Sequence, residues 1–432
     1  MTVATSSFGE VIGRAQRAGQ LVVQPRMGMG SPADMRAGLL ATRDAAATTV
    51  GTITLDSYTR IGNSAEAAAA FTAGMPLNGY PLVSHDTATT AAVLAGVMGP
   101  DFPVQVRHGS PCPQDIVRAL TAAGLHATEG GPVSYCLPYS RMPLATATAN
   151  WAQGCDLLAD RRGRGPEPHL ESFGGCMLGQ LCPPGLLVAL SVLECLFFRQ
   201  HGVHSVSLSY AQQTNAEQDR EAVYALRRLA AEFLPDADWH VVIYTYMGVY
   251  PRTPGGAEAL LTEAAKLAVH TDAARLIVKT AAEAYRIPSV PENVTALESA
   301  AAAAAAARLR PDDAAPPEDT GIFEEARSLV QAVLNLDNDL GRALVRAFCC
   351  GYLDVPYCLH PDNAGRSRSY LDDSGRLQWS RTGSMPIPKP AATSRPTDLT
   401  AAGLLAALSF VERKFDDAAL IDPLPTLGEL TR

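Results

Sequence analysis

The segment LVVQPRMGMGSPADMRAGLLATRDA, residues 21–45, contains one complete transition from a strand to a helix. A short run rich in β-branched residues ends at Arg26, and a helical pattern begins a few residues later. Ser31 suits the N-cap, Pro32 suits the first helical position, and Asp34 completes a capping box. A helix that starts directly after a strand is typical of a βα unit and a parallel sheet.

The same alternation of strand-like runs and helical stretches recurs along most of the chain. It predicts an α/β fold, and eight such strands suit a TIM (β/α)8 barrel. The predicted barrel strands are residues 21–26, 50–56, 80–84, 103–107, 126–130, 204–210, 240–246 and 275–280. A further extended segment, residues 168–175, is assigned to an insertion between the fifth and sixth barrel strands.

The repeating pattern ends after Pro288. An alanine-rich helix at 300–307 is followed by the polar, proline-bearing link RPDDAAPPEDTG. We therefore predict a barrel domain with the active site over residues 1–308, and a smaller C-terminal α-rich subdomain or arm over 309–432. The helices predicted in this arm are residues 324–336 and 340–351, with a last helix around 404–415.

Composition argues against several classes of protein. The formal net charge is -9 and no Lys/Arg-rich run occurs, so nucleic acid is not an expected partner. The longest apolar run, residues 186–198, contains Glu194 and is shorter than the roughly 20 residues that span a bilayer. A buried helix is predicted there. The N-terminal residues show neither a charged nor an apolar signal region, and we expect a cytoplasmic protein with no membrane contact.

The sequence shows no motif that indicates a metal site or a nucleotide-binding site. Its nine cysteines form no CxxC pair, and we expect reduced thiols that lie mostly in the core. His201 and His204 are spaced like metal ligands, but Gly202 between them indicates a loop and no third ligand is evident, so no metal site is expected. Neither a GxGxxG motif nor a P-loop follows a predicted strand.

Three arginines, Arg26, Arg60 and Arg107, lie at or just past the ends of predicted strands. In a barrel, the active site lies at the C-terminal ends of the strands. A guanidinium group binds a carboxylate through two parallel hydrogen bonds, so three such groups suit a substrate with two carboxylates. For any one of these arginines, a structural ion pair with a nearby Asp or Glu is an equally good interpretation.

Other polar residues lie at the same end of the predicted barrel. Glu129, in ATEGG, is followed by glycines that allow close backbone approach to a ligand. Its carboxylate can bind an ammonium group or accept its proton, or it can serve as a counter-ion for the arginines. Tyr135 and Tyr139 can bond to a substrate or lie in the core. Lys279, four residues before Glu283, suits either a Schiff base or an ordinary ion pair.

A series of short motifs occurs in a specific order along the chain. They are QPRMG (24–28), TITLDSYTR (52–60), LNGYP (77–81), QVRHG (105–109), EGGPVSYCLPY (129–139), VKTAAEAYRIP (278–288), LDVP (353–356) and NAG (363–365). Their order and spacing resemble the epsilon, or large, subunit of glutamate mutase, also called methylaspartate mutase, over nearly the whole chain. That family implies a TIM barrel in an adenosylcobalamin-dependent isomerase that interconverts L-glutamate and (2S,3S)-3-methylaspartate.

The resemblance also implies roles for individual residues. Arg26, Arg60 and Arg107 would clamp the two substrate carboxylates, and Glu129 would bind the amino group and act as base. The implied catalytic residues are Glu129, Arg60 and Lys279. The substrate shell would be completed by His108, Tyr135 and Tyr139. The implied coenzyme-lining residues are Gly28, Asn78, Pro138, Phe173, Tyr250, Lys279, Glu283 and Ile287, with Lys279 and Glu283 near the adenosyl group.

A radical mechanism and a partner follow from the resemblance as well. Homolysis of the cobalt–carbon bond would give a 5′-deoxyadenosyl radical that takes a hydrogen from glutamate. The substrate radical would fragment to acrylate and a glycyl radical, which recombine as the branched skeleton. In that family, a small sigma subunit of flavodoxin-like fold carries the signature Asp-x-His-x-x-Gly, and no such run occurs here. We expect a separate small cobalamin-binding subunit to supply it, and a homodimer of this chain flanked by two such subunits.

Two other interpretations stay open. The chain could be a cobalamin-free barrel lyase or aldolase that acts on a dicarboxylate through Lys279. It could also be a non-catalytic binding subunit that retains the fold. Within the resembled family, another amino dicarboxylate is an alternative substrate.

Overall fold

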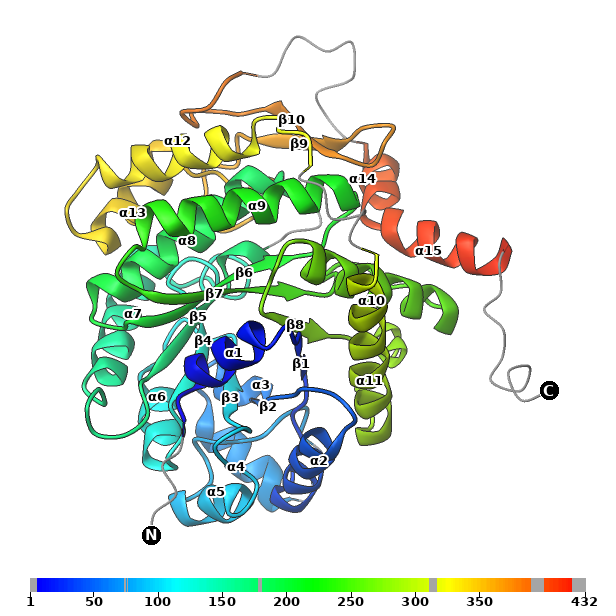
Figure 1. Ribbon diagram of the computed structural model, residues 1–432. Helices are drawn as coiled ribbons and strands as arrows, with labels where there is room; N and C mark the ends of the chain where they lie inside the picture. Colours follow the sequence, from blue (N-terminus) through cyan, green and yellow to red (C-terminus); the bar gives the residue numbers. More distant parts are fainter. Residues whose placement is uncertain are drawn as a thin grey trace.

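The computed structural model of the chain describes residues 6–73, 75, 77–177, 181–310, 317–389 and 400–421. Eight parallel strands form one sheet in the order β1-β8-β7-β6-β5-β4-β3-β2. The sheet curls into a barrel with helices around it (Figure 1), and a parallel bridge between Val23 and Thr49 joins its two ends. The strands are β1 (Val22–Pro25), β2 (Gly51–Thr54), β3 (Val104–Arg107), β4 (Ala127–Gly130), β5 (His169–Ser172), β6 (Ser205–Ala211), β7 (Asp238–Tyr244) and β8 (Arg275–Val278). The predicted α/β barrel is confirmed.

Helices connect the successive strands on the outside of the barrel. In the first half of the barrel they are α2 (Pro32–Asp44) after β1, then α3 (Ser57–Arg60), α4 (Ser64–Thr72) and α5 (Thr87–Leu94) after β2, α6 (Gln114–Ala122) after β3, and α7 (Leu144–Ala159) after β4. In the second half, η1 (Gly174–Cys176) and α8 (Pro184–Gln200) follow β5, and α9 (Ala216–Phe233) follows β6. The helix α10 (Pro254–His270) follows β7, and η3 (Ala281–Ala284) and α11 (Val290–Arg308) follow β8. The predicted N-cap and first helical residue of α2 are confirmed, since the Ser31 side chain accepts from the Asp34 amide and Pro32 holds the first helical position. The predicted capping box is not formed, because the Asp34 carboxylate bonds to the Ser31 hydroxyl.

The helix α1 (Phe8–Arg17) closes the amino end of the barrel. Phe8 and Ile12 are fully buried against Val22, Val50 and Ala274, residues at or next to the starts of strands. The Phe8 ring lies 5.0 Å from the ring of His169 on β5. This end of the barrel is therefore filled by side chains, and the opposite end, where the strands finish, is available for a site.

Two predicted strands differ from the structure. Residues 80–84 were expected to form the third barrel strand, but Tyr80 makes only an isolated parallel bridge with Leu55. Pro81 has no amide to donate, and the next amides bond locally, with Ser84 and His85 both donating to the Pro81 carbonyl. The chain therefore turns at this point instead of extending a strand.

Residues 168–175, assigned from sequence to an insertion, instead contain the barrel strand β5. The strand β5 pairs with β4 and with β6, and all four of its residues are buried. The prediction failed because the sequence HLES has no apolar alternation. Its polar side chains bond to other strands inside the barrel, so their burial depends on partners distant in sequence.

The interior of the barrel carries a polar network. Arg275 on β8 and Glu171 on β5 form an ion pair in which both side chains are 0% exposed. Gln105 donates to Glu171 at 3.2 Å and accepts from Arg275 at 3.3 Å. The Ser207 hydroxyl lies 3.1 Å from Glu171, and the side-chain carbonyl oxygen of Gln24 accepts from Arg275. Burial acts to raise the pKa of the Glu171 carboxyl, but Arg275 and Arg107 outweigh it and hold the pKa below its ordinary value.

The C-terminal part of the chain packs on one side of the barrel. The helices α12 (Ile322–Leu334) and α13 (Leu340–Cys350) lie against α7, α8 and α9, and an antiparallel hairpin of β9 (Arg368–Leu371) and β10 (Leu377–Arg381) follows. The hairpin was not predicted. The single helix expected around 404–415 is two helices, α14 (Ala401–Leu408) and α15 (Phe410–Ile421), and α15 packs on α10. The division of the chain at residue 308 stays a prediction.

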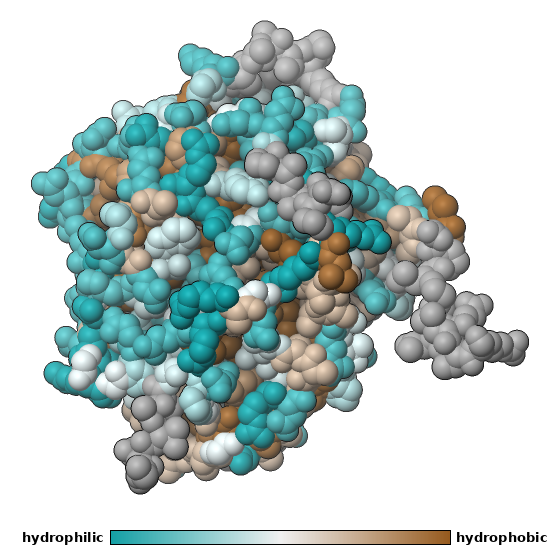
Figure 2. Space-filling model, in the orientation of Figure 1, coloured by the Kyte–Doolittle hydropathy of each residue, from teal (hydrophilic) through white to brown (hydrophobic). Residues whose placement is uncertain are grey.

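The predicted buried helix is α8, in which Leu186 to Leu193 and Glu194 are all inaccessible to solvent. Among the described residues, no helix is long and apolar enough to cross a membrane. The face drawn in Figure 2 is largely hydrophilic, with apolar side chains in small separate groups. All nine cysteines are free thiols, and most of them are buried, as expected.

We predict that Arg275→Met strongly destabilises the protein. The substitution leaves the Glu171 charge buried without its main partner, which costs about 3–5 kcal/mol. Urea unfolding at neutral pH, followed by circular dichroism, measures the loss. The control is Arg162→Met, which removes an ion pair with Glu167 between partly exposed side chains and leaves stability nearly unchanged. Equal stability of the two variants would contradict the role of the buried pair.

Candidate active site

A buried cluster of charged and phenolic groups lies where the strands β3, β4 and β7 end. Arg107 is the last residue of β3, and its Nε lies 2.8 Å from the Glu129 carboxylate on β4. The Tyr244 hydroxyl, at the end of β7, lies 2.8 Å from the Glu129 carboxylate and also within hydrogen-bond distance of Glu171, so its single proton is shared between the two. The Tyr135 hydroxyl donates to the other Glu129 oxygen. Side chains from separate strands thus meet on one carboxylate.

The protonation of Glu129 is set by competing effects. Burial is the largest and raises the pKa of this carboxyl, Arg107 opposes it, and the neighbouring Glu171 carboxylate raises the pKa further. The net shift is upward. Arg107 stays protonated, because Glu129 and the other acidic groups around it outweigh the effect of burial and hold its pKa above the ordinary value. Glu129 is therefore a carboxylate that can take up a proton more readily than an exposed one.

Aromatic rings form one wall of this cluster. The His108 ring stacks on Trp151 with centroids 5.8 Å apart and meets the Tyr135 ring edge-on at 5.1 Å. Phe173, just after β5, lies 5.2 Å from Tyr135, and Tyr139 lies 5.9 Å from it. Burial lowers the pKa of His108 to about 3, so the imidazole is neutral near pH 7. Its Nδ1 accepts from the Ser110 amide, and its Nε2 is buried without a partner among the described residues.

The other two predicted arginines lie toward the rim. Arg60 ends α3, and its stem packs so closely over Gly109 that a Cβ there would come within 2.7 Å of the arginine Cδ. Within the described part of the chain, Arg60 has no ion-pair partner. Arg26 bonds to Glu283 at 3.0 Å. Burial raises the pKa of the Tyr139 hydroxyl, and the charges of both Arg26 and Arg60 act to lower it.

Lys279 follows β8 and is nearly buried. Its ammonium group donates to the Tyr246 carbonyl at 3.2 Å, lies 3.7 Å from Glu283 and 4.3 Å from the centre of the Tyr250 ring. Burial lowers the pKa of Lys279 to about 8, against the opposite effect of Glu283, while Arg26 lowers it further. The Tyr250 hydroxyl is buried without a partner among the described residues.

A cavity of about 600 Å³ lies beside the rim and is lined in part by Gly28, Met29, Met75 and Ile287. Gly28 is required by the fold itself, because a Cβ there would come within 2.2 Å of the Thr54 carbonyl oxygen. The remaining predicted coenzyme-lining residues are also at this end: Asn78, whose side chain accepts from the Ser57 amide, and the half-buried Pro138.

The structure joins Arg107, Glu129 and Tyr135 directly, and His108 and Phe173 contact that group through Tyr135. Arg26, Lys279 and Glu283 form a second group nearer the rim. Sequence analysis missed three residues that contact the site. Glu171 was missed because its strand was assigned to an insertion. Tyr244 lies inside a predicted strand, and the alternation of side chains along that strand would have placed it toward the barrel interior. Trp151 reaches the site from α7.

These features define a barrel protein with an arginine- and glutamate-containing polar site at the ends of its strands. Comparison with known protein families agrees with this description and identifies one family. The chain belongs to the methylaspartate mutase E chain family, whose model matches residues 4–404. The expected family is confirmed.

Curated relatives support the same family. Glutamate mutase epsilon subunit from Halobacterium salinarum is 33% identical over 347 residues, covering 77% of this chain and 71% of that protein. The subunit of the same name from Yersinia enterocolitica is 31% identical over 359 residues, covering 79% and 73%. The one from Escherichia coli O157:H7 is 29% identical over 398 residues, covering 88% and 81%.

We predict that His108 makes the protein less stable in acid. Its folded pKa, about 3, lies below the ordinary 6.5, so below pH 6.5 the unfolded state binds more protons and stability falls as the pH falls. By linkage, lowering the pH to about 5 costs roughly 2 kcal/mol through this residue. In His108→Asn, the loss of unfolding free energy between about pH 7 and about pH 5 becomes smaller by up to that amount. Urea curves at the two pH values measure it, and an equal loss in parent and variant would refute the assignment.

Proposed function

We propose that this chain is the large, substrate-binding subunit of an adenosylcobalamin-dependent carbon-skeleton mutase that interconverts L-glutamate and (2S,3S)-3-methylaspartate. A separate small cobalamin-binding subunit is the proposed partner, and a homodimer of this chain flanked by two small subunits is the proposed assembly. Membership of the mutase family supports the proposal. The observation in this chain that carries it is a buried Arg107 donor that has no partner among the described residues and lies beside the buried carboxylate of Glu129.

Those donors are suited to a substrate with two carboxylates. The Nη1 of Arg107 is buried without a hydrogen-bond partner among the described residues, although its Nε is held by Glu129. Arg60 has no ion pair within the same part of the chain. A buried polar group without a partner, such as the Arg107 Nη1, is rare in folded proteins, and a ligand is a common reason for one. Arg60 is exposed, so its guanidinium is accessible to a ligand at the rim. A carboxylate accepts from a guanidinium through two hydrogen bonds, and separate arginines can hold separate carboxylates.

Glu129 is the group in position to receive the substrate ammonium. Arg107 and the hydroxyls of Tyr135 and Tyr244 fix both oxygens of its carboxylate. Because burial raises the pKa of Glu129, it can hold a proton taken from the ammonium during turnover. The wall formed by His108, Trp151 and Phe173 keeps water away from that proton.

The rim residues suit the coenzyme. When bound, adenosylcobalamin supplies a 5′-deoxyadenosyl radical that removes a hydrogen atom from the substrate. Lys279 and Glu283, which form an ion pair after β8, would hold its adenosyl group, and the cavity lined by Gly28 and Ile287 would provide further space for the coenzyme. The further residues proposed to line the coenzyme are Asn78, Pro138, Phe173 and Tyr250.

Exposed apolar side chains at the same end of the barrel support a partner there. Ile61 is 67% exposed, Met75 53%, Tyr285 68% and Ile287 57%, and all four lie in segments that follow β2 or β8. Met75 and Ile287 line one cavity, and apolar side chains that are grouped at a surface can mark a site that a partner or ligand covers. The small subunit and the corrin ring are the proposed covering.

The proposed reaction is tested by mixing this chain, the small subunit, adenosylcobalamin and L-glutamate, with methylaspartate ammonia-lyase to convert product to mesaconate. Mesaconate absorbance is expected to rise only in the complete mixture. Omission of either the small subunit or the coenzyme serves as the control. Absence of mesaconate with a small subunit shown to bind cobalamin would rule out the proposed reaction.

In the same assay we predict that Arg60→Lys lowers kcat/KM for L-glutamate by about 10- to 100-fold. The lysine keeps the charge and loses the forked pair of donors, and a charge-assisted hydrogen bond contributes about 1.5–3 kcal/mol. Circular dichroism confirms that the fold is retained. The control is Arg43→Lys, on the exposed end of α2 with its partner Asp44. An Arg60→Lys enzyme as active as the Arg43→Lys control would exclude Arg60 from substrate binding.

A second candidate function is favoured by Lys279. A lysine with a pKa of about 8 is partly neutral near that pH and can attack a carbonyl group. A cobalamin-free lyase or aldolase acting on a dicarboxylate through a Schiff base would use this property. Borohydride reduction in the presence of 2-oxoglutarate, followed by mass spectrometry, would show a stable adduct on Lys279 if this alternative holds.

A further inference from the structure

The loop between β7 and α10 is held from outside the barrel by α15. Asp416 of α15 accepts from the backbone amides of Arg252 at 2.9 Å and Thr253 at 3.0 Å, and from the Thr253 hydroxyl at 2.6 Å. Glu412, one turn earlier on α15, pairs with the Arg252 guanidinium at 2.7 Å. Two carboxylates of one helix therefore bind two consecutive residues of the loop.

The same helix supplies an apolar contact to this loop. Val411 is fully buried in a cluster with Tyr246 and Tyr250 of the loop, against which Phe410 and Phe415 also pack. The helix η3, which carries Glu283, contributes Ala281 and Ala284 to this cluster. The cluster joins the C-terminal helix to both segments that surround Lys279.

On its inner side, the loop holds Lys279. The Tyr246 carbonyl accepts from the lysine ammonium at 3.2 Å, and the Tyr250 ring lies 4.3 Å from it. The Tyr246 amide donates to the Gln212 side chain at 3.2 Å, and Gln212 donates in turn to the Leu260 carbonyl at 3.3 Å. A displacement of the loop would therefore change the environment of Lys279 directly.

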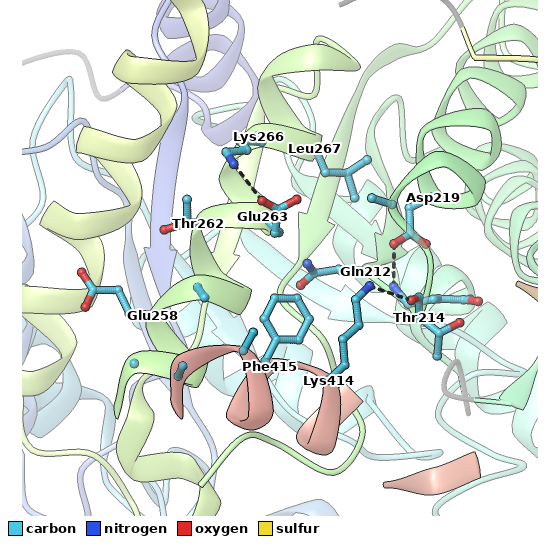
Figure 3. A pocket seen from close by; sticks show the side chains of 16 residues that line it. Gln212, Thr214, Asp219, Glu258, Thr262, Glu263, Lys266, Leu267, Lys414 and Phe415 are labelled. Carbon is cyan, nitrogen blue, oxygen red and sulfur yellow. Dashed lines mark hydrogen bonds and ion pairs between the residues drawn. The ribbon is translucent and has the colours of Figure 1, made fainter. Parts of the chain in front are cut away.

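A cavity of about 490 Å³ lies beside α15. It lies between α15, α10 and the segment after β6, and its lining includes Gln212, Phe415, Ala418 and Ala419. Figure 3 shows Lys414 and Phe415 of α15 facing Gln212 across this space. Beside the packing of α15 on α10, the contacts of Glu412 and Asp416 supply polar attachments of this helix to the loop between β7 and α10.

We infer that α15 is a positioning element for Lys279, and that Asp416 and Glu412 act by fixing the loop whose Tyr246 carbonyl and Tyr250 ring hold the lysine. The contacts among α15, the loop and Lys279 are present whatever reaction the protein catalyses. Their consequence for coenzyme binding rests on the proposed function. Neither acidic residue touches the predicted substrate, so both act through the loop.

The first test measures the titration of Lys279 in this chain alone. Competitive acetylation from about pH 6.5 to about pH 10.5, read by mass spectrometry of the peptide that contains Lys279, gives the midpoint of its titration. The groups that face the lysine are Glu283 from η3, Arg26 after β1, and Tyr246 and Tyr250 from the loop. A midpoint of about 8 is expected for the unaltered chain.

In Asp416→Ala, the midpoint is expected to rise by about one unit or more, because a loosened loop readmits water to the ammonium group. Glu412→Gln breaks only the pair with Arg252 and should give a smaller rise. The matched control is Asp417→Ala, since Asp417 is the next residue of α15 and is exposed. Equal midpoints for Asp417→Ala and Asp416→Ala would overturn the inference, and if Asp416→Ala fails to fold, the comparison of Glu412→Gln with the control decides.

The second test uses the complete assay with the small subunit. Asp416→Ala should raise the apparent KM for adenosylcobalamin and leave the KM for L-glutamate within about twofold, since Arg107 is held by Glu129 and Tyr244 and not by this loop. Equal increases in both constants would contradict a specific effect on the coenzyme side. If the unaltered chain shows no turnover, the proposed function fails, and the titration result still decides whether α15 positions Lys279.

Discussion

The hydroxyl of Tyr244 bridges two buried carboxylates, and the rest of the site depends on how their charge is balanced. Glu129 and Glu171 lie on neighbouring strands in register with each other. Two buried carboxylates on neighbouring strands can both be ionised only if nearby positive charges balance them. Arg107 balances the charge of Glu129, and Arg275 balances the charge of Glu171. The two ion pairs and the shared Tyr244 hydroxyl therefore form one continuous network through the barrel.

This arrangement explains why the barrel interior is polar. In many barrels of this type, branched apolar side chains fill the interior. Here Gln24, Gln105 and Ser207 surround Arg275 and Glu171 and bond to them. The residues around Arg275 therefore support the site at the strand ends, because they fix the Glu171 carboxylate that orients Tyr244. Rigid support of this kind positions charged groups without reorganisation when a ligand binds.

Sequence reasoning found the barrel and most of the charged residues of the site, and its failures have physical causes. Arg107 and Glu129 follow apolar runs, so their places at the strand ends were evident. Glu171 was not, since the strand β5 is made of polar residues whose burial depends on partners from β6 and β8. Residues 80–84 looked like a strand by composition, but Pro81 prevents one. Which arginines pair internally also lies beyond sequence: Arg26 binds Glu283, whereas Arg60 has no ion pair in the described part of the chain.

The attachment of α15 also bears on the order of events during synthesis. The residues of the barrel leave the ribosome long before residues 410–421 do, and domains fold as their segments emerge. The nascent barrel can close while the loop that carries Tyr250 is still without Asp416 and Val411. The environment of Lys279 is then completed last, when α15 arrives. A chain whose synthesis has not reached α15 therefore lacks a finished lysine site, and assembly of that site reports that α15 has been made.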